Sequence, residues 1–577
     1  MIMGFVFANY ETHEISTLNL KGNKNISRGD FYMLPKGNKR TIFVNQIGYP
    51  IEAKKIAVFL KPGSFQIVNV ENQQIVYSGE VDPRPIDDPC AGAVVYHGDF
   101  SPLKQAGTYV IQQNKETSSP FKIAANPYEN VLNGLLKAFY YLRCGMELTE
   151  EYAGPWHHGA CHTGEAIVYD DPDKRIDCTG GWHDAGDYGR YTVTAAKAVA
   201  DLLTGFEFFP EAFASMPAIP ESDGKTPNIL LECRYELEWL LKMQDDETGG
   251  VYHKVTTFAF PPLDCMPEDD KADLYISPVS ATATASFSAV MALAARIYRA
   301  YDEEFASRCL AAAKKAFQWL SAHPEYPGFK NPPDISTGEY GDECDKDERF
   351  WASAELYRTT GEEFYHDHLK ILAGDPSFSK TGLGWIEMGG FGTIAYLINN
   401  ERETDEALVT NLQEEWLAEA NRIVKNCEED GFHISLREKD YVWGSNMVLM
   451  NNAMVLIVAD RICQNEKYIT CALEHIHYLL GRNILDVCYI TGFGDRPVVN
   501  PHHRPSVADE VAAPVPGFVA GGPNKNLNDP YARDILSGKP PAQCFVDHQE
   551  SYSTNEITIY WNSPAVFVFS YFVAEGS

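Results

Sequence analysis

The stretch "GGWHDAGDYGRY", from Gly180 to Tyr191, places His183, Asp184 and Asp187 close together among glycines and aromatic residues. Two aspartates three residues apart are typical of a helix start, because acidic side chains cap the first turn and suit the positive end of the helix dipole. Taken alone, the stretch favours that ordinary interpretation. The rest of the chain has to decide between a helix start and a catalytic site.

The chain beyond this stretch has the apolar pattern of helices. Apolar residues recur at helical spacing in about ten segments from residue 129 onward, and no strand-like run of comparable strength interrupts them. Many such helices without a short repeat predict a closed helical toroid or a large bundle, and periodicity alone does not choose between the two. The segments are "ENVLNGLLKAFYYLRC", "GRYTVTAAKAVADLL", "NILLECRYELEWLLKM", "SATATASFSAVMALAARIY", "FASRCLAAAKKAFQWL", "DERFWASAELYRTT", "TIAYLIN", "EEWLAEANRIV", "MNNAMVLIVADRI" and "YITCALEHIHYLL".

The chain before this stretch is β-like. Short runs between Thr41 and about Ile123, such as "KKIAVFLK", "SFQIVNV" and "GTYVIQQ", are rich in Val, Ile, Phe and Tyr and are separated by turn residues. Their spacing predicts a small immunoglobulin-like β-sandwich. A chain of 577 residues is too long for one hydrophobic core. We therefore divide it into a loosely ordered arm at 1–40, a β-sandwich at 41–124 and a helical domain at 125–577.

The composition disfavours several classes of partner and location. A formal net charge of −32 would repel nucleic acid and anionic membranes. No span of about 20 apolar residues predicts a transmembrane helix, and the N-terminal "MIMGFVFANYETHE" lacks the basic start of a signal peptide. The 13 cysteines are odd in number and lack framework spacing, which suits a reducing compartment rather than a disulfide scaffold. We expect a cytoplasmic protein, with secretion as the alternative if the assigned start is incomplete.

Two cysteines and two histidines form a candidate metal set. Cys144 ends the first helical segment, Cys161 and His162 are adjacent in "ACHTG", and His183 belongs to the stretch quoted above. Two thiolates and two imidazoles are the ligands of closed, tetrahedral zinc sites. The alternative is that the cysteines are buried apolar residues and the histidines lie nearby by coincidence.

A third acidic residue stands far along the chain, in "DHQESYSTNEITIYWNSP". Glu556 precedes the aromatic pair Tyr560 and Trp561, and an apolar environment raises the pKa of a carboxyl group, which suits a general acid. Asp184 or Asp187, in a polar turn, would stay ionised and serve as a base. One carboxyl with a raised pKa and one with an ordinary pKa are the equipment of glycoside hydrolysis. The ordinary alternative for Glu556 is charge at a helix N-terminus.

The loop "TGFGDRPVVNPHHRPS", residues 491–506, is interrupted by prolines and glycines and cannot form a regular helix. On this loop, His502, His503 and Arg504 are hydrogen-bond donors for a sugar or a carboxylate; the alternative is a solvated basic loop. Tryptophans in loop-like positions can stack on sugar rings, although core packing is their commoner use. These tryptophans are Trp182, Trp385, Trp443 and Trp561.

Together these segments resemble glycoside hydrolase family 9, the inverting cellulase family, over nearly the whole chain after residue 40. "GGWHDAGDYGRY" matches its Asp-Ala-Gly-Asp motif, "CYITGFGDRPVVNPHHR" its histidine motif and "YSTNEITIYWNSP" its Asn-Glu motif. The β-like front resembles the immunoglobulin-like domain that precedes many members. The resemblance implies an all-α (α/α)6 barrel with an active-site cleft at one end. Cys488 and Ser551 depart from the family pattern, and neither departure removes a catalytic group.

The resemblance also implies residue roles. Asp187 corresponds to the base that activates water, Asp184 helps to hold that water, and Glu556 corresponds to the general acid. Inversion requires the two carboxyl groups to stand about 6.5–9.5 Å apart, so that a water molecule fits between base and sugar. The expected substrate contacts are His502, Arg504, Trp443, Tyr552 and Trp385.

Two metal sites follow from the same resemblance, and no organic cofactor is expected. Members with the immunoglobulin-like domain have a structural zinc on residues that match Cys144, Cys161, His162 and His183, which would tie the catalytic turn to a rigid site. "STGEYGDECDKDERFW" resembles the family's calcium loop, and the alternative is a solvated acidic loop. Its candidate calcium ligands are Thr337, Gly338, Asp342, Asp347 and Glu348.

The leading hypothesis is hydrolysis of β-1,4-glucosidic bonds in cellulose-derived glucans or cello-oligosaccharides, by an endoglucanase or an exo-acting cellodextrinase. The runner-up is an exo-β-glucosaminidase acting on chitosan oligosaccharides, whose cationic chains an acidic surface tolerates. A non-catalytic carbohydrate-binding protein is a remote alternative, because both carboxyl groups are present. A zinc hydrolase is disfavoured, because four protein ligands leave no open position for water. The sequence leaves the oligomeric state open.

Overall fold

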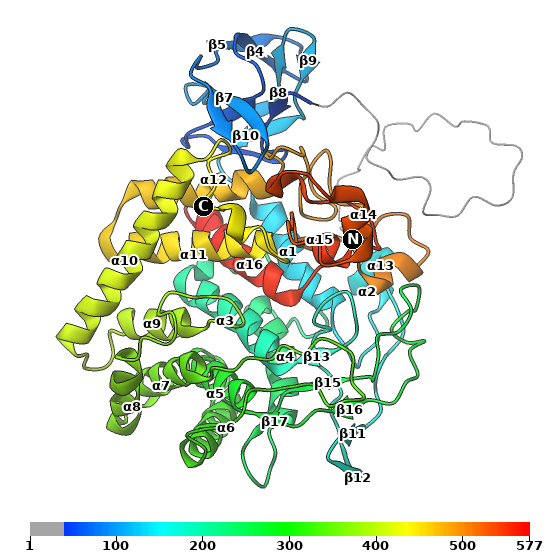
Figure 1. The fold of residues 1–577 in the computed structure, drawn as a ribbon, viewed down its shortest axis with the longest axis vertical. Helices are drawn as coiled ribbons and strands as arrows, with labels where there is room; N and C mark the ends of the chain where they lie inside the picture. The colour runs from blue at the N-terminus through cyan, green and yellow to red at the C-terminus, as the bar shows by residue number, and fades with distance from the viewer. Residues whose placement is uncertain (1–39, 577) are drawn as a thin grey trace, which may run out of the picture. The chain divides into compact units, whose positions relative to one another are not determined.

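The computed structural model describes residues 40–576, so nearly all of the predicted arm lies outside the described part. Its first region is β-structure, which confirms an N-terminal immunoglobulin-like domain of mostly sheet (Figure 1). The strands are β1 (Ile42–Phe43), β2 (Gly48–Pro50), β3 (Ile56–Phe59), β4 (Ser64–Asn69), β5 (Ile75–Glu80), β6 (Ile86–Asp88), β7 (Ala93–Asp99), β8 (Gly107–Gln113), β9 (Glu116–Thr117) and β10 (Phe121–Ala124).

These strands form two sheets around one core. The first has the order β1-β3-β7-β6, and the second has the order β2-β10-β8-β4-β5 with β9 paired to β8. Pairing is antiparallel except between β2 and β10. Side chains alternate between core and solvent along β8, as a half-buried strand requires. Phe65, Tyr109 and Phe121 meet in the core between the sheets.

Helices make up most of the remainder, as predicted, with ends that differ from the predicted segments by a few residues. The helices are α1 (Glu129–Tyr141), α2 (Glu150–Ala153), α3 (Thr192–Phe208), α4 (Asn228–Lys242), α5 (Ala281–Tyr298), α6 (Glu303–Ala322), α7 (Lys346–Thr360), α8 (Glu363–Ala373), α9 (Gly389–Leu397), α10 (Glu406–Glu429), α11 (Ser445–Cys463), α12 (Glu466–Leu479), α13 (Arg504–Ala508), α14 (Pro530–Leu536), α15 (Tyr552–Asn555) and α16 (Ile559–Ala574).

The long helices fall into two kinds. Helices α3, α5 and α16 are buried on nearly every residue, whereas α6, α8 and α10 bury only one face. A helix that is apolar all round belongs inside the protein, and an amphipathic one covers it. Helix α3 packs against both α5 and α16, α5 against α7, α7 against α9, and α11 against α16. Helix α11 is apolar and long enough to span a membrane, but 67% of its apolar window is buried, as in a core helix.

Short strands interrupt the helical region, which the sequence pattern did not predict. Strands β11 (Ala166–Val168), β12 (Asp171–Ile176), β13 (Arg190–Tyr191), β15 (Lys254–Thr256) and β16 (Tyr275–Ile276) form a sheet in the order β12-β11-β16-β15-β13, and β14 (Val251–Tyr252) pairs with β17 (Val279–Ser280). Most are two or three residues long, too short for a periodicity signal. The sheet fixes the C-terminal end of the stretch quoted at the start, because β13 pairs with β15.

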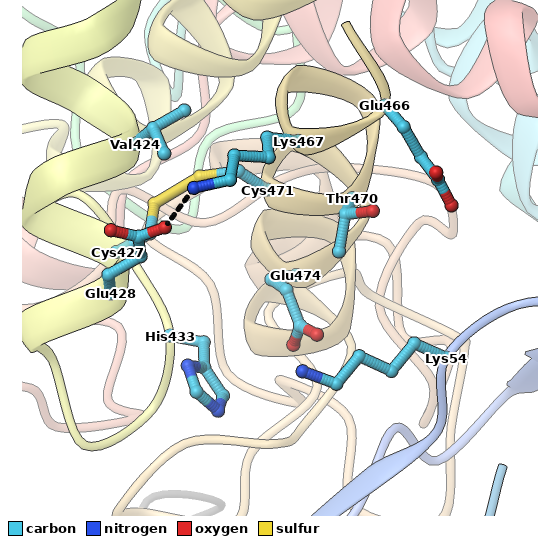
Figure 2. Close-up of a pocket in the computed structure, with 10 residues that line it drawn as sticks. All are labelled: Lys54, Val424, Cys427, Glu428, His433, Glu466, Lys467, Thr470, Cys471 and Glu474. Carbon is cyan, nitrogen blue, oxygen red and sulfur yellow. Dashed lines mark hydrogen bonds and ion pairs between the residues drawn. A yellow bond between two sulfur atoms is a disulfide. The ribbon is translucent and has the colours of Figure 1, made fainter.

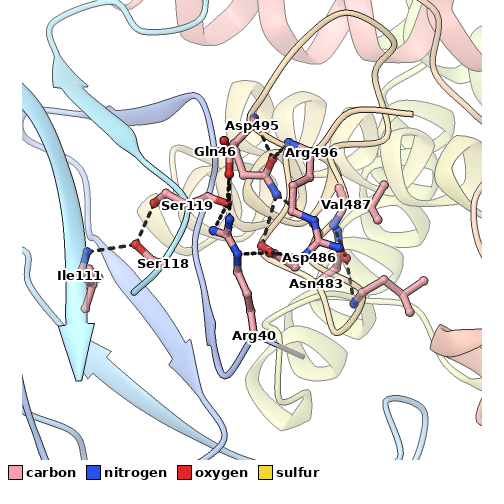
Figure 3. A network of polar contacts seen from close by, with 11 residues as sticks. Arg40, Gln46, Ile111, Ser118, Ser119, Asn483, Asp486, Val487, Asp495 and Arg496 are labelled. Carbon is pink, nitrogen blue, oxygen red and sulfur yellow. Dashed lines mark hydrogen bonds and ion pairs between the residues drawn. The ribbon is translucent and has the colours of Figure 1, made fainter. Parts of the chain in front are cut away.

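The side chain of Gln46 joins the β-sandwich to the helical region (Figure 3). Gln46 donates from Nε2 to the Asp486 carbonyl oxygen (3.0 Å), and its Oε1 accepts from the backbone N–H groups of Asp495 (3.0 Å) and Arg496 (2.8 Å). Arg40 forms ion pairs with Asp486 (3.3 Å) and Asp495 (3.0 Å). These contacts hold the first part of the loop at residues 491–506, which we call the histidine loop.

Cys427 of α10 and Cys471 of α12 form a disulfide, which the odd number and scattered spacing of the cysteines did not predict. The two residues are 44 positions apart in sequence, so no local spacing reports that their helices pack together. The remaining cysteines of residues 40–576 are free, so the chain has no disulfide framework in that part.

Candidate active site and metal centre

Asp184 is a buried carboxylate held by two hydroxyl groups. Tyr340 Oη donates to Asp184 Oδ2 at 2.7 Å, and Thr194 Oγ1 donates to Asp184 Oδ1. The Tyr340 hydroxyl also lies 3.1 Å from the hydroxyl of Tyr560. The Asp184 backbone N–H donates to Gly189 at 2.9 Å, which closes the turn. Both carboxylate oxygens therefore have fixed partners.

Asp187 lies in the same turn and is equally buried. Its Oδ2 accepts from the Gly189 N–H at 2.9 Å and from the Tyr191 hydroxyl at 3.4 Å. Arg504 and Lys254 are its nearby positive charges, and both lower its pKa. Gly189 and Tyr191 thus hold one oxygen of the Asp187 carboxylate, and the positive charges of Arg504 and Lys254 favour its ionised form.

Burial raises the pKa of both aspartates, whereas the sequence predicted ordinary values in a polar turn. The pKa of Asp184 rises to about 7 through burial, with the Asp187 charge adding to it and the bonds from Thr194 and Tyr340 opposing it. Burial also raises the pKa of Asp187, and Arg504 offsets part of that rise. The difference arises because the turn is packed under other segments, which its polar sequence does not reveal.

Glu556 is brought next to this turn by backbone pairing. An antiparallel bridge joins Ala185 to Thr558, and the Ile559 N–H donates to the Asp184 carbonyl at 2.8 Å. Glu556 is half-buried. Burial raises its pKa well above the usual value, and the charges of Asp187 and Asp184 raise it further. The sequence predicted this direction from the aromatic surroundings of Glu556.

The histidine loop packs directly against the turn that carries Asp184 and Asp187, which we call the aspartate turn. Arg504 donates from Nη1 to the Gly186 carbonyl at 2.7 Å and from Nε to the Pro261 carbonyl at 3.0 Å. His502 pairs with Glu556 in a parallel bridge, and its Nδ1 lies 2.6 Å from the Gln549 carbonyl. A Cβ atom on Gly186 would lie 2.0 Å from the His502 carbonyl oxygen, so this approach requires glycine.

A buried carboxylate ties this loop to the Glu556 segment. Asp547 accepts from the N–H groups of Val499 (2.9 Å) and Asn500 (2.8 Å) and from Asn555 Nδ2 (3.0 Å). The His502 N–H in turn donates to the Asn555 carbonyl at 2.9 Å. The two predicted motifs therefore form one hydrogen-bonded unit.

The aromatic candidates divide into two groups. Trp443 is 40% exposed, its ring centroid lies 5.4 Å from that of Tyr552, and the Tyr552 ring lies 5.8 Å from that of His502. Half-buried Trp385 packs edge-on against Tyr340 at 5.0 Å. Trp182 and Trp561 are fully buried, so the structure makes them core residues rather than sugar platforms.

Two residues that donate to Asp184, Thr194 and Tyr340, were missed from the sequence, as was Lys254, whose charge acts on Asp187 without a direct bond. Tyr340 lies in the segment interpreted as a calcium loop and adopts a left-handed φ of 47°, which only a structure reveals. Lys254 lies in β15, in the segment "YHKVTT". Burial lowers the pKa of Lys254 to about 7.

The four predicted zinc ligands converge. One ligand atom from each of Cys144, Cys161, His162 and His183 lies within 4.8 Å of all the others, and the Cys161 Sγ to His183 Nε2 distance is 3.8 Å. His162 Nδ1 is buried without a hydrogen-bond partner, while its Nε2 lies 3.5 Å from Asp270 Oδ2. A free ring nitrogen on one side and a carboxylate on the other are the arrangement of a metal-binding histidine.

The five calcium candidates divide into two groups with different partners. Lys254 Nζ donates to Thr337 Oγ1 at 3.2 Å and to the Gly338 carbonyl at 2.5 Å, so an ammonium group occupies these two oxygens. Asp342 Oδ2 and both Glu348 carboxylate oxygens are buried without hydrogen-bond partners, and Asp347 Oδ2 accepts from the Met388 N–H. The converging donor groups found within residues 40–576 do not include these acids.

The second converging group found there is Cys427, Cys471 and His475. Its two cysteines are joined as the disulfide, and they line a pocket of about 350 Å³ with Lys54, His433 and Glu474 (Figure 2). No residue of the candidate active site or of the Cys/His cluster lines that pocket. This pocket is therefore distinct from the site that contains Asp184, Asp187 and Glu556.

Known proteins match the chain over both regions. Residues 128–569 match glycosyl hydrolase family 9, and residues 38–118 match the cellulase N-terminal ig-like domain. A cellodextrinase of Butyrivibrio fibrisolvens is 39% identical, with 92% of this chain and 99% of that protein covered.

Solved structures match equally well. A single mutant of a thermostable endoglucanase from Alicyclobacillus acidocaldarius is 43% identical, with a TM-score of 0.87 and coverage of 92% of this chain and 99% of that one. A Zn-binding triple mutant of a family 9 endoglucanase is 32% identical, with a TM-score of 0.85 and coverage of 91% and 99%.

Proposed function

Because the chain belongs to glycosyl hydrolase family 9, we propose that Asp187 and Glu556 are the base and the acid of its inverting reaction. The protein is a glycoside hydrolase of the cellulase type that cleaves β-1,4-glucosidic bonds. The observation that carries the role assignment is the backbone pairing of the Asp184–Asp187 turn with the Glu556 segment. The two aspartates of one turn thus lie beside the segment of Glu556, which comes from a distant part of the chain.

The proposed reaction is a single displacement. Asp187 takes a proton from water as the water oxygen bonds to the anomeric carbon, and Asp184 orients that water. The bond from the anomeric carbon to the glycosidic oxygen breaks as Glu556 gives its proton to that oxygen. The product has inverted configuration, and proton exchange with solvent returns Asp187 to the ionised form and Glu556 to the protonated form.

The pKa shifts support this division of roles. Glu556 lies beside two acidic groups and is half-buried, so it keeps its proton near neutrality. Burial raises the pKa of Asp187, and the charges of Arg504 and Lys254 oppose that rise and favour the ionised form that a base needs. We propose His502, Trp443 and Tyr552 as substrate contacts beside Glu556, because their rings form a continuous row. Trp385 is proposed as a further contact beside Asp184.

Substitution of the two carboxyl groups tests the assignment. Asp187→Asn and Glu556→Gln should each lower kcat on cellopentaose by about a thousandfold or more, with the melting temperature preserved. The anomer of fresh product, followed by NMR, should be α. Substantial activity in Asp187→Asn, or a β-anomer, would contradict the proposed mechanism. Release of glucosamine from chitosan pentamer, without action on cellopentaose, would replace the substrate assignment with the glucosaminidase.

We propose that the helical region, residues 125–577, is an (α/α)6 barrel that follows a β-sandwich at 41–124 in the sequence. The support is the alternation of helices buried all round with helices buried on one face, and the neighbour sequence α16-α3-α5-α7-α9. In this arrangement the first kind forms the inner ring and the second covers it. The active-site turn precedes α3 and the Glu556 segment precedes α16, and these two helices pack together.

The Cys/His cluster is proposed as a structural zinc site. Cys144, Cys161, His162 and His183 would supply all four positions of a tetrahedral ion, which adds rigidity rather than a reactive water. His183 precedes Asp184, so its fixed ring would also fix the turn. For Asp342, Asp347 and Glu348 we propose a cation of the calcium type, because three buried carboxylate oxygens have no other partner. Thr337 and Gly338 are left out of this site because Lys254 binds them.

A further inference from the structure

Two exposed phenylalanines lie on the segment that follows β15. Phe258 is 38% exposed and Phe260 is 45% exposed. Single exposed apolar side chains are common on protein surfaces and need no explanation. Here two exposed phenylalanines lie two residues apart on one segment, and that segment is hydrogen-bonded to Arg504 of the active site.

The segment is anchored at both ends. The Phe258 carbonyl oxygen accepts from the Ser336 N–H (2.8 Å) and from the Ser336 hydroxyl (3.0 Å). At the other end, the Pro261 carbonyl accepts from Arg504 Nε at 3.0 Å. Between them, Thr257 Oγ1 donates to the Ala259 carbonyl at 2.7 Å. The exposed rings are therefore carried by a fixed backbone.

Each ring is supported from one side. The Phe258 ring stacks on Tyr275 with centroids 3.9 Å apart and planes 14° from parallel. The Phe260 ring has the Arg504 guanidinium carbon 5.5 Å from its centroid. A supported, partly exposed aromatic face loses little conformational freedom when a ligand stacks on it.

Arg504 connects this segment to the reaction centre. The same guanidinium that contacts Phe260 donates to the Gly186 carbonyl, next to Asp187. The Phe258 anchor Ser336 lies in the loop that carries Tyr340, the donor to Asp184. The exposed rings thus adjoin the base side of the active site, while Trp443 and Tyr552 adjoin the acid side.

We propose that Phe258 and Phe260 form an aromatic platform that stacks on the apolar face of one glucosyl unit of the glucan chain, beyond the two units at the scissile bond. This inference rests on the proposed function. A neutral sugar presents C–H groups to an aromatic face, and these two exposed rings offer such faces on a fixed backbone. The platform would make the reaction depend on chain length.

The test compares substrates of different length. Phe260→Ala should lower kcat/KM on cellohexaose by about 3- to 10-fold, the range expected for one aromatic contact, and leave kcat/KM on cellotriose within about twofold. Phe364→Ala is the matched control, because Phe364 of α8 is also exposed, at 50%, and lies on an element far from the carboxylates in sequence. It should change neither value.

Phe260→Tyr keeps the ring and should retain the length preference. If Phe260→Ala proves unstable in thermal melting, Phe260→Leu carries the same test, since it removes the ring and keeps the volume. Equal loss on both substrates would mean that Phe260 acts through Arg504, and would overturn the platform. No change on cellohexaose would also overturn it. If the wild-type protein cleaved neither oligosaccharide, the proposed function itself would fail.

Discussion

The segments that carry the proposed base and the proposed acid face each other but are held in different ways. The aspartate turn is held through its side chains: Thr194 and Tyr340 bind Asp184, and Gly189 and Tyr191 bind Asp187. Glu556 is held through its backbone, and Trp443 is the hydrogen-bonding side chain that opposes the rise of its pKa.

This difference corresponds to the two tasks. A base must stay charged and must aim at one water molecule, so buried carboxylates need donors and nearby cations. An acid must keep a proton near neutral pH, so burial and neighbouring negative charge serve it better than donors do. The support of the turn should therefore be more sensitive to substitution than the support of the acid.

Loss of the Cys/His cluster should have the largest effect on the turn. Cys161→Ser should remove bound zinc, lower the melting temperature by about 10 °C or more and abolish activity, because structural zinc contributes directly to folding. Metal analysis and calorimetry measure both effects. Cys309→Ser, at a buried free cysteine of α6, is the control and should keep the metal. A stable, zinc-free wild-type protein would disprove the structural role.

Removal of one donor to Asp184 should affect catalysis more than folding. Tyr340→Phe should lower kcat by about 10- to 100-fold with KM nearly unchanged, since a hydrogen bond to a charged group contributes about 1.5–3 kcal/mol. Tyr301→Phe is the matched control, because Tyr301 is 44% exposed. An unchanged kcat would show that Thr194 alone holds Asp184.

A smaller effect is expected on the acid side. Trp443→Phe removes the donor that lowers the pKa of Glu556, so the alkaline limb of the kcat/KM profile should move to higher pH by a fraction of a unit. The acidic limb, which reports the base, should stay in place. A shift of the acidic limb instead would assign Trp443 to the aspartate turn.

The smallest effect is on stability, and its sign follows from the raised pKa of Asp184. In the unfolded chain Asp184 ionises near pH 4, whereas in the folded protein it keeps its proton to about pH 7. Its contribution to stability is therefore fully present below pH 4 and declines as pH rises from 4 to 7. Asp184→Asn should raise the melting temperature at pH 8 by about 2 °C and leave it unchanged at pH 4. An equal change at both pH values would contradict the titration.

The sequence predicted the parts of the site that lie within continuous motifs. Asp184 and Asp187 lie in one motif and Glu556 in another, and backbone pairing joins the two segments. The four Cys/His residues converge as the resemblance implied. The contact of Tyr340 with Asp184 could not be predicted from the sequence, because the position of Tyr340 depends on a left-handed backbone in a long loop.

The candidate calcium ligands show a related limit of the sequence, and the site stays a prediction. Thr337 and Gly338 offer suitable oxygens, but Lys254, some eighty residues earlier, folds back onto them. The buried Trp182 and Trp561 show the same limit. Loop-like sequence around a tryptophan does not report whether another segment covers it.

At Gly186 the aspartate turn and the histidine loop lie closer together than a side chain would allow, which limits the substitutions that this enzyme can accept. A methyl group there would meet the His502 carbonyl at 2.0 Å, and His502 is paired with Glu556. The spacing between the base segment and the acid segment therefore depends on the absence of a Cβ atom at residue 186. A residue larger than glycine at position 186 would push His502, and with it the paired Glu556, away from the turn whose aspartates hold the water.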